Sequence, residues 1–319
     1  GDLNLDQSDW VVLGQEDHDL LGGTIASAGD VDGDGLEDLL IGSHENDTNG
    51  DRSGEVYLVL GSQVEASWPD GGVIGADDNQ RFYGSAALDY AGYDVDSAGD
   101  IDGDGLDDLL IGAPFNSDGP SLGGQVYLVL ASSLDVNGGD LDLSADLSMS
   151  DYTFLPESPF DYVGWSVAGL GDIDGDNRPD IAIGAPFDDD GGTNAGAVYL
   201  FLNSNLPAGG AELDVADADY KLVGEAALDE SGYIVTSAGD VDGDNLNDIL
   251  ILSASNDAGA TDAGKAYLVL AADLPVGGGT VSLSSAHFSF ASEAPNGGDY
   301  MSIAAAGDVQ ADLAAVEHR

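Results

Sequence analysis

Residues 27–43 read SAGDVDGDGLEDLLIGS, and this stretch decides the fold. Numbered from Asp30, it carries acidic side chains at positions 1, 3, 5 and 9, followed by an apolar run. Alternate side chains of a tightly curled loop can converge on one point, and calcium takes six to eight oxygen ligands. Glycines at positions 4 and 6 permit the left-handed turns that such curling requires. The stretch therefore predicts a calcium-binding loop that leads directly into a β-strand.

The same loop recurs along the chain at a nearly constant interval. Its first aspartate is Asp30, Asp100, Asp172, Asp240 or Asp308. Each unit also repeats a block of the GEVYLVL type and a later block of the DYKLVGE type. These blocks are short, rich in β-branched and aromatic residues, and bounded by Gly, Asn, Asp and Pro, which is typical of strands.

Four strands in a unit of about 70 residues are typical of propeller blades. We therefore expect an all-β fold, a β-propeller-like array of four-stranded antiparallel blades with four complete blades and a split fifth. A β-sandwich would not repeat at a fixed period, and a parallel β-helix repeats over a shorter one. No window sustains a helical apolar period, so helices should be scarce.

The boundaries follow from the repeat, and one domain is expected over residues 1–319. A strand four of the split blade lies within about 1–21, the complete blades span about 22–86, 87–156, 157–224 and 225–291, and a partial blade spans 292–319.

Each complete loop is predicted to bind one calcium ion, about four in all, through four carboxylates and the backbone carbonyl of position 7. Magnesium is less suited, because it prefers a rigid octahedron and keeps its waters. A set of solvated acidic turns is the alternative, but it does not account for identical spacing in four copies. The predicted ligands are Asp30, Asp32, Asp34, Leu36 and Asp38; Asp100, Asp102, Asp104, Leu106 and Asp108; Asp172, Asp174, Asp176, Arg178 and Asp180; and Asp240, Asp242, Asp244, Leu246 and Asp248.

The charge of the chain restricts its partners. It has 61 acidic and six basic residues, a formal net charge of -55. Nucleic acid is excluded as a partner, since phosphate binding needs Lys and Arg. Anionic membranes are disfavoured for the same reason, and no apolar run is long enough to span a membrane. Counter-ions must offset the self-repulsion; adaptation to a saline habitat would also explain the acidity.

Over nearly the whole chain, the sequence resembles the FG-GAP repeats of the integrin alpha-chain β-propeller and its bacterial relatives. The GAP element stands intact at residues 112–114 and 184–186, and the FG glycine at Gly22, Gly92, Gly164 and Gly232. The Phe of the FG element is absent. The resemblance implies an extracellular propeller for adhesion or ligand binding, in which calcium stiffens hairpins on one face, and it maps the family's calcium ligands onto the sixteen aspartates above.

The fifth unit departs from this pattern. Gln310 occupies position 3 after Asp308, so no calcium is expected there. Three alternatives stay open for the split blade. The terminal strands close a ring within one chain, the chain is part of a longer one, or the N-terminal strand pairs with another copy in a head-to-tail filament.

No catalytic apparatus is recognisable: the chain lacks Cys and a G-x-S-x-G motif, and its four His are scattered. The absence of Cys suits a secreted protein stabilised by metal. We expect a non-catalytic, secreted, calcium-binding structural or self-assembling surface component. The alternatives are an integrin-like adhesion module binding an extracellular protein or glycan, and part of a polysaccharide-active enzyme. The strand-three tyrosines are expected in the core. Trp68 and Trp165 are also expected there, with a binding surface as the alternative. Asn46 heads a glycosylation motif.

Overall fold

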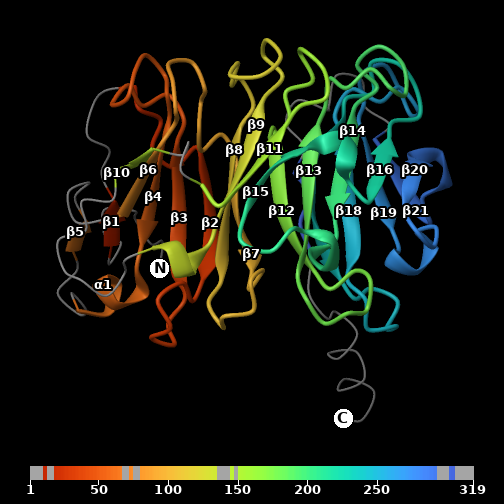
Figure 1. The fold of residues 1–319 in the computed structure, drawn as a ribbon. Helices are drawn as coiled ribbons and strands as arrows, with labels where there is room; N and C mark the ends of the chain where they lie inside the picture. Colours follow the sequence, from red (N-terminus) through yellow and green to blue (C-terminus); the bar gives the residue numbers. More distant parts are fainter. Residues whose placement is uncertain are drawn as a thin grey trace, which may run out of the picture.

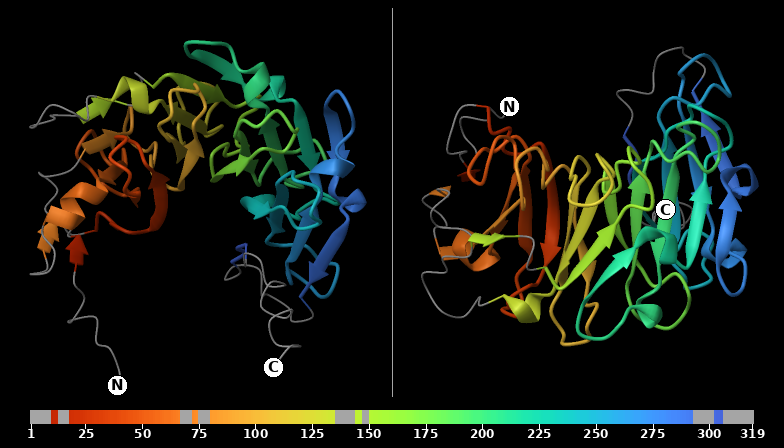
Figure 2. Two further views of the ribbon diagram at one scale, coloured as in Figure 1. Left: turned by 90° about the horizontal axis from the view of Figure 1, so that it is seen from below. Right: turned by 45° about the horizontal axis from the view of Figure 1, so that its top comes forward.

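The fold consists of four β-sheets placed side by side in chain order, as the four blades of a β-propeller (Figure 1). The computed structural model describes residues 10–12, 18–66, 72–74, 80–134, 144–146, 150–292 and 302–305. Seen from below, the described blades form an arc, with the first and the fourth blade at its two ends (Figure 2). The all-β propeller prediction is confirmed.

Each blade contains four consecutive antiparallel strands. In the first blade these are β2 (Thr24–Gly29), β3 (Asp38–Ser43), β4 (Glu55–Val59) and β6 (Gln80–Tyr83). In the second they are β7 (Val95–Gly99), β8 (Asp108–Ala113), β9 (Gln125–Val129) and β11 (Tyr152–Leu155). In the third they are β12 (Ser166–Gly171), β13 (Asp180–Ala185), β14 (Ala197–Phe201) and β16 (Tyr220–Val223). In the fourth they are β17 (Ser231–Gly239), β18 (Asp248–Ser253), β19 (Lys265–Val269) and β21 (Phe288–Ala291).

Helix is confined to single short turns in the described residues, as expected. These are α1 (Gly61–Ala66) and the 3-10 helices η3 (Ala131–Ser133), η5 (Asn203–Asn205), η6 (Val215–Asp217), η7 (Ala271–Asp273) and η8 (Leu283–Ser285). None of these helices has the length and apolarity needed to cross a bilayer.

The structure adds a strand that the repeat pattern did not predict. In three blades a fifth strand pairs in parallel with the fourth, and it comes from the connection between strands three and four of the following blade. These strands are β10 (Ser144–Asp146), β15 (Ala211–Asp214) and β20 (Gly279–Ser282). Blades two, three and four therefore each contribute one strand that hydrogen-bonds to the preceding blade.

The same rule places the N-terminal strand. β1 (Trp10–Val12) pairs in parallel with β5 (Gly72–Ile74), which lies in the connection between strands three and four of the first blade. β1 thus pairs with β5 as the fourth strand β6 pairs with β10, and its assignment to strand four of a split blade stays a prediction. The predicted strands and defective loop of the fifth unit fall almost entirely outside the described residues.

The hydrophobic core lies between the blades. Strand side chains of neighbouring blades form three clusters, one at each blade boundary. The strand-three tyrosines, Tyr57, Tyr127, Tyr199 and Tyr267, are fully buried, which confirms their core role. Burial of such large side chains is the main favourable contribution to packing.

The GAP glycine has a steric role at these boundaries. A Cβ on Gly112 would lie 2.2 Å from the carbonyl oxygen of Gly164, the FG glycine of the next repeat. The same contact joins Gly42 to Gly92 and Gly184 to Gly232. Glycine is required because two backbones meet there. The fourth blade carries Leu252 at this position, so its outer boundary differs from the internal ones.

Candidate metal centres

The acidic loops connect the first two strands of each blade, at one end of the propeller. A register shift in the first strand, between Ser27 and Gly29 in blade one, turns the chain into the loop. Position 9 is the first residue of the second strand, so that strand holds its carboxylate in place. In blade two, Asp108 accepts hydrogen bonds from the backbone N–H of Ile101 at 2.7 Å and of Ala131 at 2.8 Å. One carboxylate thereby ties the loop to the end of strand three.

Three of the four predicted carboxylates converge in every complete loop. The side chains of positions 1, 3 and 9 each offer one oxygen, and these oxygens lie within 4.8 Å of one another. The sets are Asp30, Asp32 and Asp38; Asp100, Asp102 and Asp108; Asp172, Asp174 and Asp180; and Asp240, Asp242 and Asp248.

The position 5 aspartates, Asp34, Asp104, Asp176 and Asp244, are not members of these groups. In loop one, Asp34 Oδ1 accepts the N–H of Leu36 at 2.8 Å, and the same bond recurs in the other three loops. Leu36 and its equivalents at position 7 thus donate an N–H to position 5. Their carbonyls, like the carboxylates of position 5, stay predicted ligands.

The electrostatics of the position 9 carboxylates fit a cation. Burial raises the pKa of Asp108 to about 7, against the lowering effect of its two N–H donors, and the charges of Asp102 and Asp104 raise it further. Asp180 is raised to a pKa of about 7 and Asp38 to about 6 in the same way. A buried carboxylate with two acidic neighbours resists ionisation unless a positive charge compensates it. Oxygen ligands of this charge are those that calcium prefers.

Comparison with known proteins agrees with this architecture. The FG-GAP repeat profile matches residues 22–59, 91–129 and 163–201, which are the first three strands of blades one to three. The chain carries FG-GAP repeats. It is homologous to integrin alpha chains across much of its length, including integrin alpha pat-2 of Caenorhabditis elegans, with 27% identity over 80% of this chain.

Other relatives show the same partial overlap. Integrin alpha-7 of Rattus norvegicus is 36% identical over 50% of this chain and 12% of its own length. A phosphatidylinositol-glycan-specific phospholipase D of Dictyostelium discoideum is 28% identical over 76% of this chain and 26% of its own length. The chain spans about a quarter or less of the length of these relatives.

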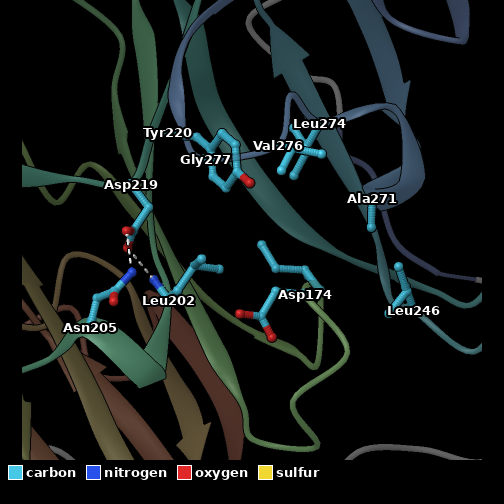
Figure 3. A pocket seen from close by; sticks show the side chains of 12 residues that line it. Asp174, Leu202, Asn205, Asp219, Tyr220, Leu246, Ala271, Leu274, Val276 and Gly277 are labelled. Carbon is cyan, nitrogen blue, oxygen red and sulfur yellow. Dashed lines mark hydrogen bonds between the residues drawn. The ribbon is translucent and has the colours of Figure 1, made fainter.

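The third FG-GAP repeat places its acidic loop beside a surface pocket of about 390 Å³. Asp174, at loop position 3, lines this pocket together with Asn205, Asp219 and Tyr220 (Figure 3). Asp219 accepts hydrogen bonds from Leu202 N at 2.8 Å and from Asn205 Nδ2 at 2.6 Å. The pocket therefore opens beside position 3 of the third loop.

The opposite end of the FG-GAP repeats carries an aromatic surface that the sequence reasoning missed. Eight half-buried rings are in continuous contact across all four blades: His44, Tyr90, Tyr93, Phe115, Tyr162, Trp165, Phe187 and Tyr233. Trp165 was expected in the core, but it lies in this cluster, 4.8 Å from the Tyr93 ring and 5.4 Å from the Tyr233 ring. It also lines a hollow of about 400 Å³ with Phe160 and Asn194.

A second missed feature is a buried aspartate three residues before each FG glycine. Asp19, Asp89, Asp161 and Asp229 are at most 6% exposed. The D-x-x-G spacing recurs in all four repeats and was the available signal.

Two other sequence expectations can be placed. Asn46, the first residue of the glycosylation motif, is 2% exposed, and its Oδ1 accepts the N–H of Thr48 at 2.8 Å, so the folded structure does not present its amide for glycan attachment. Trp68 lies outside the described residues.

Proposed function

We propose that this chain is a non-catalytic, extracellular, calcium-binding repeat module whose hairpin ions stabilise the blades. The observation that carries the proposal is the convergence of three carboxylates in each of four loops. The ions would be held by the sixteen predicted aspartates and the carbonyls of Leu36, Leu106, Arg178 and Leu246. Their role is structural: they neutralise carboxylates that would otherwise repel one another in the folded state.

Calcium titration tests this proposal. We expect about four ions per chain by isothermal titration calorimetry, and a melting temperature that rises with calcium, because an ion bound only by the native state stabilises it by mass action. Magnesium at the same concentration is the control and should raise the melting temperature less. An unchanged melting temperature in excess calcium and in chelator would contradict the proposal.

An adhesion or ligand-binding role is supported by two facts. The integrin alpha chains are homologous to this chain across much of its length. The eight half-buried rings form one continuous cluster across the four blades, and aromatic residues are enriched at binding sites. Binding to arrays of extracellular-matrix proteins and glycans should be lost on Trp165→Ala and kept on Ile25→Ala, an exposed apolar residue of β2. Equal binding by both variants would remove the aromatic surface as the site.

Self-association is the second candidate, favoured by the outer face of the fourth blade. Phe288 and Phe290 on β21 are 51% and 63% exposed, whereas Tyr152 and Phe154, which hold the same positions in blade two, are almost fully buried by blade three. Leu252 replaces the GAP glycine on this face. A second copy could therefore not pack here with the close backbone contact that joins the internal blades. Sedimentation analysis tests this: concentration-dependent assembly that Phe290→Ser abolishes supports it, and a monomer at all concentrations overturns it.

The proposed absence of catalysis is tested separately. The relative named as a phospholipase overlaps this chain over 26% of that relative's length. We expect no turnover of phosphatidylinositol glycans or of polysaccharides by the purified chain, and release of product above a heat-inactivated control would overturn this part of the proposal.

A further inference from the structure

The buried aspartates of the D-x-x-G segments lie at the blade boundaries, at the end opposite the acidic loops. In blades two and four each meets an amide side chain. Asp229 accepts a hydrogen bond from Asn256 Nδ2 at 2.9 Å. Asp89 is hydrogen-bonded to Asn116, and it also accepts from Ser85 Oγ at 2.8 Å and from the N–H of Ala86 at 2.7 Å. Each of these carboxylates accepts at least two hydrogen bonds.

The boundary between blades two and three is different. The position that is Asn46, Asn116 or Asn256 in the other repeats is Asp188 here, so Asp161 faces a second carboxylate. Asp161 is 3% exposed, and its buried Oδ2 has no hydrogen-bond partner. A buried carboxylate oxygen without a donor is costly, so Asp161 Oδ2 needs a further partner.

The contacts of the Tyr199 hydroxyl also indicate that this site is short of hydrogen-bond donors. The hydroxyl of Tyr199 lies 2.7 Å from Glu157 Oε1 and 2.7 Å from Asp188 Oδ2. A phenol has one proton and can donate to one of these oxygens. The other short contact joins two acceptors, unless a cation or an additional proton lies between them.

The charges of the surrounding side chains show how large the shortage of positive charge is. Four carboxylates gather here, those of Glu157, Asp161, Asp188 and Asp190. One ammonium group serves them: Lys221 Nζ contacts Glu157, Asp188 at 2.9 Å and Asp190 at 2.6 Å. With all groups ionised the cluster carries a net charge of about three negative charges. Asp161 and Asp188 are buried, and buried charges of one sign need a compensating partner.

We propose that this boundary binds a further hard divalent cation, such as calcium, through the carboxylates of Asp161, Asp188 and Glu157. Oxygens of Glu157, Asp188 and Asp190 lie within 4.8 Å of one another around the Lys221 ammonium. The unpartnered Oδ2 of Asp161 belongs to a carboxylate that interacts electrostatically with Asp188 and Glu157. All of these are oxygen ligands of the kind calcium takes. In this proposal the ion replaces the Lys221 ammonium on Glu157 and Asp188, and Lys221 keeps its contact with Asp190. The site lies at the far end of the blades from the hairpin loops and is independent of them.

The test is a difference in metal content between the intact protein and Asp188→Asn, which restores the residue of the other three repeats. Protein dialysed against calcium at pH 8 is analysed by mass spectrometry for bound metal. We expect the wild type to hold one ion more than Asp188→Asn, however many ions the hairpins bind. Glu157→Ser, which copies Ser85 of blade two, should lose the same ion and serves if the first variant does not fold. Asp118→Asn, at the position equivalent to Asp190 in blade two, is the control and should lose none.

Equal metal content in wild type, Asp188→Asn and Glu157→Ser would overturn the proposal and assign the deficit to a shared proton. Loss of an ion on Asp102→Asn, a hairpin change, reports only on the acidic loops. The failure of one class of site is therefore distinguishable from the failure of the other.

Discussion

Asp107 of the second acidic loop is hydrogen-bonded to Asp30 of the first in both directions. The N–H of Asp30 donates to Asp107 Oδ2 at 3.0 Å, and the N–H of Asp107 donates to the Asp30 carbonyl at 3.2 Å. Asn247 holds the equivalent place in loop four, and its N–H donates to the Asp172 carbonyl of loop three at 2.7 Å. Neighbouring loops therefore position one another, and the first predicted ligand of one site depends on the docking of the next blade.

Removing this link should weaken the first site. Asp107→Ala leaves the N–H of Asp30 without its acceptor, and we expect a loss of about 1 kcal/mol in stability and a several-fold loss in calcium affinity at one site. Calcium titration by calorimetry and thermal melting check both. Asp107→Asn keeps an acceptor oxygen and is the matched control; equal effects from both variants would show that the link does not matter.

Gly29 should tolerate no side chain. Its φ is +76°, and an added Cβ would lie 2.0 Å from Asp107 Oδ2. Gly239 in blade four has a φ of +71° with no atom within 4 Å of the same point. Gly239→Ala should cost about 1–2 kcal/mol for the left-handed conformation alone. Gly29→Ala should cost clearly more, as measured by chemical denaturation, because it also displaces the second loop.

Positions 5 and 9 of a loop should respond differently to loss of charge. Asp108 accepts two buried N–H groups, so Asp108→Asn should cost about 1–3 kcal/mol even in chelator. Asp104 is exposed, so Asp104→Asn should change stability in chelator by less than about 0.5 kcal/mol and lower only calcium affinity. Melting with and without calcium separates the two effects, and a large loss for Asp104→Asn in chelator would contradict this division.

Stability without calcium should fall as the pH rises from about 4 to 7. Asp96 on β7 is one cause: burial raises its pKa to about 7, and the nearby charge of Asp94 adds to this. In the folded state the Asp96 carboxyl group keeps its proton at a pH where the same group in the unfolded chain, with its usual pKa of 3.8, has lost it. The stabilisation is therefore complete below the unfolded pKa and is lost through pH 7. Asp96→Ala, which copies Ala26 and Ala168, should flatten the difference between melting at pH 5 and pH 8 in chelator; an unchanged difference would show that Asp96 does not contribute.

Equivalent aromatic residues in different blades should contribute unequally to the free energy of unfolding. Phe154 is fully buried between blades two and three, and Phe154→Ala should cost about 3–5 kcal/mol. Phe290 is 63% exposed, and Phe290→Ala should cost less than about 1 kcal/mol in dilute protein. Denaturation at two protein concentrations checks this, and a large, concentration-dependent cost at Phe290 would indicate a partner on the outer face of the fourth blade.

Local chemistry made most of the blade predictable. In residues 30–38, alternating acidic residues and glycines favour a tightly curled loop. The DLLIG run that starts at its end favours a buried strand. Repetition of this loop at a nearly constant interval then implies one structural unit used four times. The strand-three tyrosines were assigned to the core from the same short blocks. These features depend on residues close together in the chain, so the amino-acid sequence by itself determined them.

Tertiary structure decided what forms between blades. The parallel fifth strand is short, and its partner lies far away in the sequence, as with Ser144 and Arg81. The aromatic surface joins rings from four repeats, and the acidic cluster joins Glu157 and Asp188 to Lys221 of a later strand. Neither pattern repeats at a local period, because each is created by the docking of one blade on the next. Sequence alone therefore determined the blade and its acidic loop, and only the packed propeller revealed the surfaces at the opposite end.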